Sequence, residues 1–142
     1  MTQSGRIELM APAGSFESLQ AAITNGADSV YFGVDQLNMR ARASINFTIE
    51  DLPEIVKRCE EKKVRTYLTL NTIIYDHDLT IIKTLLDAAK DAGITAVIVM
   101  DQAVISYARQ IGMEIHISTQ INITNIETVK FYAMFADTMV MS

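Results

Sequence analysis

Short apolar runs alternate along the chain with segments whose apolar residues recur at helical spacing. The apolar runs predict strands at 7–10, 28–33, 64–70, 96–100, 114–118 and 138–141. The segments between them predict amphipathic helices at 16–25, 50–62, 78–92, 103–111 and 126–135. The chain therefore predicts six strands separated by five helices.

The residues at the joints support these boundaries. Ser15 is expected to cap the first helix, and Pro53 falls in a first helical turn, where its missing N–H costs little. Gly26, Gly93 and Gly112 follow three helices at the position that often adopts a left-handed conformation. Similar residues recur at 25–30, 92–97 and 135–140, which indicates a repeated αβ unit rather than a solenoid.

Strands that alternate with helices and are apolar along most of their length predict a parallel sheet covered by helices. We favour the first six βα units of a TIM-type (β/α)8 barrel over an open doubly wound sheet, because no Gly-x-Gly-x-x-Gly loop follows the first strand. A closed barrel takes about 250 residues. The 142 residues are therefore predicted to form one partial barrel domain, 1–142, truncated before the remaining strands and any C-terminal domains.

Composition excludes several classes of protein. The formal net charge of −5 gives no general attraction to nucleic-acid backbones. The sequence has no apolar run long enough to span a membrane and no secretory signal at its start, so a cytoplasmic location and no membrane partner are expected. The single cysteine, Cys59, lies in a charged helical stretch and is expected to be a structural thiol.

Candidate site residues follow the carboxyl ends of the predicted strands, where barrel enzymes bind their substrates. Arg40 and Arg42 lie in a long connection after the second strand, and guanidinium groups suit carboxylates or phosphates. The alternative is a solvated loop surface. Asn71 ends the third strand on the face of Tyr67 and Thr69, where it either meets a ligand or orders the following loop.

A polar stripe is predicted on the fifth strand and its extension. Period two places His116, Ser118, Gln120 and Asn122 on one face, with Asn125 closing the stretch. Buried polar groups need partners, so the stripe indicates either a ligand site or a structural hydrogen-bond network. The ordinary pKa of histidine, about 6.5, suits proton transfer, so His116 is a candidate acid or base.

Other residue patterns give weaker evidence for a metal or catalytic site. Asp76, His77 and Asp78 resemble a metal triplet, but they directly precede a helix, where aspartate serves as an N-cap. No metal site is predicted. The motifs of serine hydrolases and zinc proteases are missing from the sequence, and Cys59 lies far from any strand end.

Four blocks of the sequence together resemble peptidase family U32, the collagenase-like peptidases. They are residues 8–14, residues 26–33, residues 40–43 with Asn46 and Phe47, and residues 116–125, which contain Ser-Thr-Gln-x-Asn-x-Thr-Asn. The resemblance spans essentially the whole chain in order. It implies the N-terminal part of a barrel, and an iron–sulfur cluster held by cysteines in a part of the protein that follows this chain.

The resemblance also implies a choice of functions. Members are named as proteases, while other relatives act in oxygen-independent hydroxylation of tRNA wobble uridine, of ribosomal RNA or of the ubiquinone ring. We favour RNA-base hydroxylation by the complete protein, with RNA as partner and this chain alone inactive. The alternatives are a peptidase with His116 as base, or a non-catalytic module that forms homo-oligomers through exposed strand edges.

The residues expected to act in the favoured function form two groups. The expected catalytic residues are His116 and Arg42, and those expected to bind substrate are Arg40, Asn46, Asn71, Ser118, Gln120, Asn122 and Asn125.

Overall fold

Six parallel strands pair in chain order to form one curved sheet. The computed structural model describes residues 5–34 and 47–142. Its strands are β1 Met10–Pro12, β2 Ser29–Phe32, β3 Arg65–Leu70, β4 Ala96–Val99, β5 Glu114–Ile117 and β6 Thr138–Met139. Each pairs only with its sequence neighbours, in the order β1-β2-β3-β4-β5-β6. The predicted parallel sheet is confirmed.

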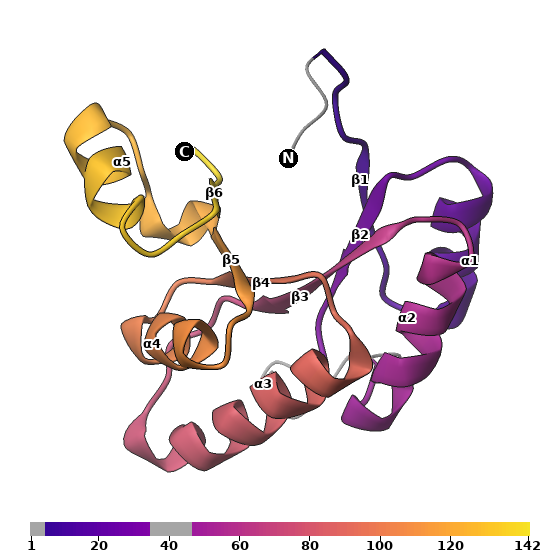
Figure 1. Ribbon diagram of the computed structural model, residues 1–142, viewed down its shortest axis with the longest axis horizontal. Coiled ribbons are helices and arrows are strands. Elements are labelled where there is room, and N and C mark those ends of the chain that lie inside the picture. Colours follow the sequence, from indigo (N-terminus) through magenta and orange to yellow (C-terminus); the bar gives the residue numbers. More distant parts are fainter. Residues whose placement is uncertain (1–4, 35–46) are drawn as a thin grey trace.

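The connecting helices lie outside the curve of the sheet, as Figure 1 shows. They are α1 Phe16–Thr24, α2 Leu52–Glu60, α3 Leu79–Ala92, α4 Gln102–Gln110 and α5 Ile126–Tyr132. Short 3-10 turns at Ile49–Asp51, Asp76–Asp78 and Thr119–Ile121 precede α2, α3 and α5. The helices thus leave the concave face of the sheet uncovered within the described residues.

The main hydrophobic core lies between the sheet and the helices. Period-two alternation sends one set of strand residues outward, and the fully buried members include Val30, Leu68, Val97 and Ile115. Helix residues such as Leu19, Ile55, Leu85 and Val104 are also fully buried in this cluster. The apolar stripes seen in the sequence are the surfaces that cover the sheet.

Most predicted boundaries are confirmed. Ser15 caps α1 by accepting a hydrogen bond from the backbone N–H of Ser18, and Gly93 ends α3 at a φ of 89°. The first strand is an exception, because β1 begins at Met10 and extends to Pro12, beyond the strand predicted at 7–10. At a sheet edge, a proline leaves the ladder intact when its missing N–H would face away from the neighbouring strand.

The repeated joints have a repeated structural role. Asp28, Thr95 and Asp137 each lie just before a strand, and each side chain accepts a hydrogen bond from the backbone of the preceding strand or its lead-in. The three donors are the backbone N–H groups of Leu9, Thr66 and Ile115, at 2.8, 3.1 and 2.9 Å. The recurring residues therefore join neighbouring strands at the amino-terminal end of the sheet.

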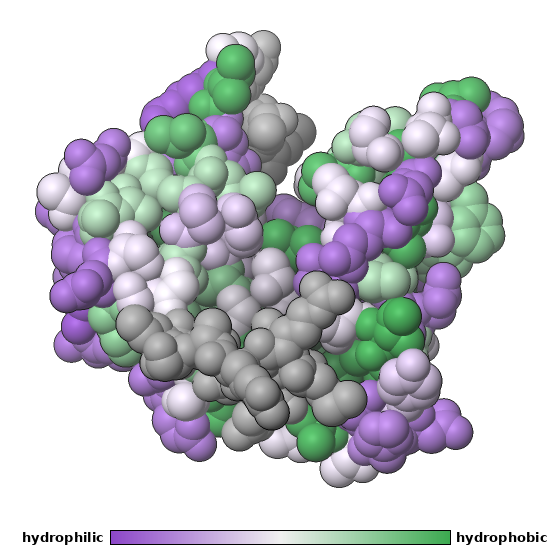
Figure 2. Space-filling model, turned by 180° about the vertical axis from the view of Figure 1, so that it is seen from behind, coloured by the Kyte–Doolittle hydropathy of each residue, from purple (hydrophilic) through white to green (hydrophobic). Residues whose placement is uncertain are grey.

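The sheet is open at β1 and β6. Space-filling atoms show a hollow between the part of the molecule that carries β1 and the part that carries α5 (Figure 2). Exposed apolar side chains lie near both edges, at Ile7, Leu9 and Met10 on one side and at Val140 and Met141 on the other. In residues 5–34 and 47–142, no helix has the length and apolar character to cross a membrane.

Candidate functional site on the concave face

Polar side chains line the concave face of the sheet. On β3, Arg65, Tyr67 and Thr69 point away from the face that carries Leu68 and Leu70. The register aligns Tyr67 with Ala96 and Glu114, and aligns Thr69 with Ile98 and His116. Barrel interiors are usually filled by branched apolar residues, so this polar face departs from the common pattern.

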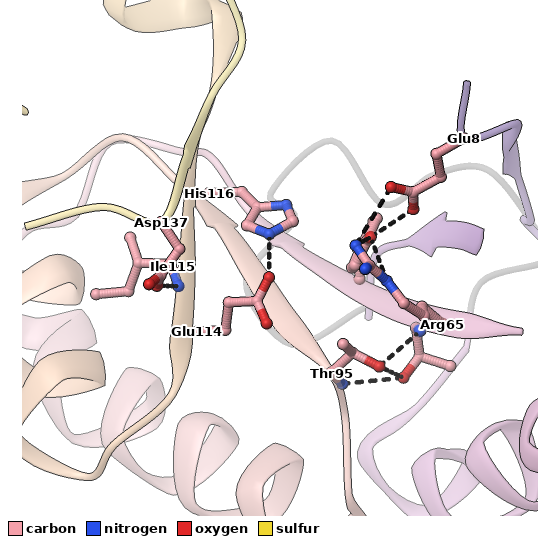
Figure 3. A network of polar contacts seen from close by, with 9 residues as sticks. Glu8, Arg65, Thr95, Glu114, Ile115, His116 and Asp137 are labelled. Atoms are coloured by element: carbon pink, nitrogen blue, oxygen red, sulfur yellow. Dashed lines mark hydrogen bonds and ion pairs between the residues drawn. The ribbon is translucent and has the colours of Figure 1, made fainter. Parts of the chain in front are cut away.

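Glu8, Arg65 and Tyr67 form one hydrogen-bonded group. Figure 3 shows Glu8 and Arg65 of this group facing each other beside β3. The Tyr67 hydroxyl donates to Glu8 Oε1 at 2.5 Å, and Arg65 donates to Glu8 Oε2 at 3.2 Å. Arg65 Nε also donates to the Tyr67 oxygen at 2.9 Å. The network joins β3 to the segment before β1.

This group changes the acid–base properties of its members. Burial raises the pKa of Tyr67 to about 12, and the hydrogen bond to the Glu8 carboxylate adds to this effect. Burial acts to raise the pKa of Glu8, but hydrogen bonds and the Arg65 charge outweigh it and lower that pKa. The Ser29 hydroxyl is fully buried and close to Glu8, but its geometry gives it no hydrogen-bond partner among the described residues.

His116 lies on β5, on the concave face of the sheet, and its ring packs beside Tyr67 of this group. Its side chain is buried, and its Nε2 is 2.7 Å from Glu114 Oε1. The Tyr67 ring lies against the imidazole, with ring centres 4.7 Å apart and planes inclined by 59°. A buried imidazole held by a carboxylate and an aromatic ring is a suitable group for proton transfer.

Asn71 and Ser118 lie at the carboxyl end of the same face. The pairing of Leu70 and Ile117 with Val99 places the two residues at one level, two strands apart. Two strand spacings correspond to roughly 10 Å. Ser118 is buried, and its hydroxyl accepts a hydrogen bond from the backbone N–H of Gln120 at 3.3 Å. The concave face therefore carries three of the predicted residues: Asn71, His116 and Ser118.

The extended stripe predicted beyond Ser118 is wrong, because β5 ends at Ile117 and the chain turns into the 3-10 turn Thr119–Ile121. Gln120 and Asn122 are exposed, and Asn122 adopts a left-handed conformation with a φ of 58°. Asn125 caps α5 by accepting a hydrogen bond from the backbone N–H of Thr128 at 2.9 Å. Period-two alternation fails here because Ser118 caps the turn and ends the strand.

Three predicted residues, Arg40, Arg42 and Asn46, lie outside the described residues. The structure describes the residues on either side of them, where Val34 and Phe47 form a parallel bridge and are both buried. The roles of these three residues remain predictions.

Sequence reasoning missed Glu8, Arg65 and Glu114. The signal was present for two of them, because Arg65 and Glu114 share the period-two face of Tyr67 and His116 at the starts of otherwise apolar strands. Glu8 precedes β1, and its contact with Tyr67 depends on the parallel pairing of β1, β2 and β3. No local pattern indicates that contact.

The described residues contain neither a candidate metal site nor a reactive cysteine. These residues contain no group of three or more His, Cys, Asp or Glu side chains that could hold a metal ion. At the acidic triplet, Asp78 accepts a hydrogen bond from the backbone N–H of Tyr75 at 3.0 Å, which orders the turn before α3. Cys59 is the one cysteine of the sequence and is fully buried on α2, so these residues do not fit a four-cysteine iron–sulfur cluster.

The profile of peptidase family U32 matches residues 14–142. The chain belongs to this family. A collagenase of Porphyromonas gingivalis (strain ATCC BAA-308 / W83) is 54% identical over 135 residues, which are 95% of this chain and 33% of the collagenase. The tRNA hydroxylation protein P1 of Bacillus subtilis (strain 168) is 34% identical over 127 residues, covering 88% of this chain and 30% of that protein.

A third relative is named for a modification of ribosomal RNA. The 23S rRNA 5-hydroxycytidine C2501 synthase of Escherichia coli (strain K12) is 33% identical over 90% of this chain and 19% of its own length. The chain thus spans about a third or less of the length of these three relatives.

Similar solved structures identify the fold as part of a barrel. The structure of the U32 peptidase Mk0906 has a TM-score of 0.74 at 13% identity and covers 99% of this chain and 61% of Mk0906. Deoxyribose phosphate aldolase from Aeropyrum pernix has a TM-score of 0.70 at 17% identity, over 94% of this chain and 63% of the aldolase. The six parallel strands form a half-barrel, which is a partial (β/α)8 barrel as predicted.

Proposed function

We propose that the protein containing this chain hydroxylates RNA bases, in tRNA at the wobble uridine or in rRNA, without molecular oxygen. The observation that carries the proposal is the concave face, where a buried imidazole, an amide and a hydroxyl lie on one polar surface. Relatives named for tRNA hydroxylation and for rRNA hydroxycytidine synthesis match along 88% and 90% of the chain.

The residues of the concave face suit a pyrimidine ring. An amide such as that of Asn71 offers one donor and one acceptor side by side, which complements the imide edge of uracil. His116 supplies a group that moves a proton as the ring carbon loses its hydrogen. Arg40 and Arg42 would bind the phosphates or an anionic co-substrate through paired N–H groups.

Replacing a ring C–H by C–OH removes two electrons from the base, so an oxygen donor and a two-electron acceptor must take part. Neither is supplied by the side chains described here. The proposal therefore requires a non-O2 oxygen donor and an external two-electron acceptor, to which the cluster implied for the rest of the protein would pass the electrons one at a time.

Peptidase activity is the second candidate, because the 54% identical relative is a collagenase by name. The geometry of the described residues gives it less support. Burial raises the pKa of Cys59 to about 11, which disfavours the thiolate, and the Ser118 hydroxyl caps a turn. Neither side chain is paired with a base, as a nucleophile for peptide cleavage would require.

The deciding experiment removes the complete gene and measures nucleosides by mass spectrometry of tRNA and rRNA. We expect one hydroxylated pyrimidine to disappear and to return when the full protein is restored. Unchanged nucleosides would reject the proposal. In the same assay Arg42→Ala should fail to restore the modification without unfolding the protein, whereas Arg109→Ala on α4 serves as the matched control.

A second assay addresses the peptidase candidate. Purified full-length protein is incubated with gelatin and with peptide libraries, with and without divalent metals. We expect no cleavage. Cleavage that disappears in the His116→Ala variant would instead establish peptidase activity with His116 as a working group.

A further inference from the structure

Glu114 holds His116 in a single orientation. The two residues lie on the same face of β5, two positions apart, and the carboxylate Oε1 is 2.7 Å from Nε2. Figure 3 shows the second ring nitrogen, Nδ1, on the side of the imidazole away from Glu114. The Tyr67 ring, 4.7 Å from the imidazole centre, limits rotation of the ring.

The partner determines which nitrogen carries the proton. A carboxylate at neutral pH only accepts hydrogen bonds, so Nε2 must be the donor. A neutral imidazole has one N–H, and Nδ1 is then left with a free lone pair. Tautomers of this kind are set by the bond at the other ring nitrogen.

We propose that Glu114 is a positioning residue, which fixes His116 as the Nε2–H tautomer and makes Nδ1 the nitrogen that accepts the proton of the substrate. This inference rests on the proposed function for its substrate, an RNA base. The assignment of the His116 tautomer does not depend on that function.

A structural ion pair would use the same two residues differently. An ion pair requires only that His116 be charged, and it gives no preference for either tautomer of the neutral ring. Other charged groups also face His116, because the Tyr67 ring that packs on the imidazole is hydrogen-bonded to Glu8 and Arg65. The tautomer of the neutral ring therefore separates positioning from simple charge pairing.

The chain suits a direct measurement, because it contains two histidines, His77 and His116. Histidine labelled with 15N gives two imidazole spin systems, and His77→Gln assigns them. His77 is not a neutral reference, because its Nε2 lies 3.4 Å from Asp78 Oδ1. The same chain unfolded in denaturant provides the reference for rings in tautomeric exchange.

For the neutral ring of His116, we expect one nitrogen with the chemical shift of an N–H and one with the chemical shift of a bare imine nitrogen. Couplings to the ring protons should identify Nε2 as the N–H. A spectrum with the proton on Nδ1, or one averaged like that of the unfolded chain, would overturn the proposal.

Two variants test the role of the carboxylate. Glu114→Gln keeps an oxygen that accepts from Nε2–H, so the tautomer should persist. Glu114→Ala removes the acceptor, and the His116 signals should move toward the averaged pattern of the unfolded chain. Unchanged signals in Glu114→Ala would overturn the proposal, and if this variant does not fold, the spectrum of the unaltered chain still decides.

Activity of the complete protein gives the functional test. We expect Glu114→Ala to lower kcat by about tenfold or more with little change in KM, and Glu114→Gln to recover much of it, because the acid–base step needs the correct tautomer. A kcat unchanged in Glu114→Ala would overturn the positioning role. If the nucleoside assay rejects RNA hydroxylation while the Nε2–H tautomer is observed, the proposed function fails and the tautomer assignment stands.

Discussion

Tyr67 on β3 donates a hydrogen bond to the carboxylate of Glu8, which precedes β1, across two strand pairings. Tyr67 is 2% exposed, and Arg65 donates to the same phenolic oxygen at 2.9 Å. The phenol thus satisfies both neighbours in a place where unpaired polar atoms are costly. Together with the Arg65–Glu8 ion pair, this bond connects the segment before β1 to the centre of the sheet.

The first prediction concerns this phenol. Tyr67→Phe keeps the ring and removes the oxygen, so Glu8 loses one hydrogen bond and Arg65 loses two. We expect the free energy of unfolding to fall by about 1–3 kcal/mol, the usual range for a buried polar group that loses its partner. Denaturant titration followed by circular dichroism measures the change.

Tyr107→Phe is the matched control for Tyr67→Phe. The Tyr107 hydroxyl donates to Asp87 at the surface, at 2.8 Å. Exposed pairs contribute little, so we expect a change within about 0.5 kcal/mol. Equal losses in the two variants would contradict a special role for the Glu8–Tyr67–Arg65 group.

The second prediction is a dependence of stability on alkaline pH. The pKa of Tyr67 is raised from 10.0 to about 12, first by burial and then by the bond to Glu8. Because the folded state holds this proton more tightly than the unfolded state, the stabilisation is complete below pH 10 and is lost as the pH rises from 10 to about 12.

The measurement is the free energy of unfolding against pH, together with ultraviolet titration of the five tyrosines. Tyr67 should ionise only near the top of the range in the folded protein, while the pKa of Tyr107 is also raised, first by its hydrogen bond to Asp87. Tyr67→Phe should remove that late step and flatten the alkaline loss of stability. A late step that persists in the variant would assign the raised pKa to another tyrosine.

The third prediction tests the repeated joints. Asp137→Ala removes the acceptor for the Ile115 N–H and should lower the free energy of unfolding by about 1–2 kcal/mol, because a hydrogen bond to a charged group is lost. Asp91→Ala, at an exposed position on α3, should have little effect. Thermal melts of both variants provide the comparison, and similar midpoints would show that the joint is dispensable.

These joints explain why the fold was predictable. The recurrence of an acidic or hydroxyl residue before three strands was visible in the sequence, and each side chain has the same partner type in the structure. Helix ends were predictable for similar reasons, since the bond from Ser18 N–H to Ser15 and the left-handed Gly93 depend on residues a few positions apart.

The candidate site was predictable only in part. His116 lies on the concave face because alternation holds within β5, and Asn71 and Ser118 directly follow β3 and β5 at one level of the register. The prediction failed at Gln120, whose backbone N–H donates a hydrogen bond to the Ser118 hydroxyl and so favours a turn over continued extension. Glu8 was missed because its contact with Tyr67 joins residues 59 positions apart.

The last prediction concerns the open edges of the sheet. Within the described residues, β1 and β6 each pair on one side, so each has unpaired backbone groups on the other. Exposed apolar residues lie beside both edges, with Leu9 58% and Val140 37% exposed. We propose that the 142-residue chain self-associates through these edges, and we expect sedimentation velocity to show at least a dimer at micromolar concentration.

Charges at the edges should oppose this association. Leu9→Lys combined with Val140→Lys places ammonium groups where another strand would pair, a device that blunts sheet edges in natural proteins. The double variant should sediment as a monomer with an unchanged circular dichroism spectrum. Ile81→Lys, on the exposed face of α3 and away from both edges, should remain associated. A monomer in the unaltered chain, or association that survives the edge lysines, would show that the strand edges do not hold copies of the chain together.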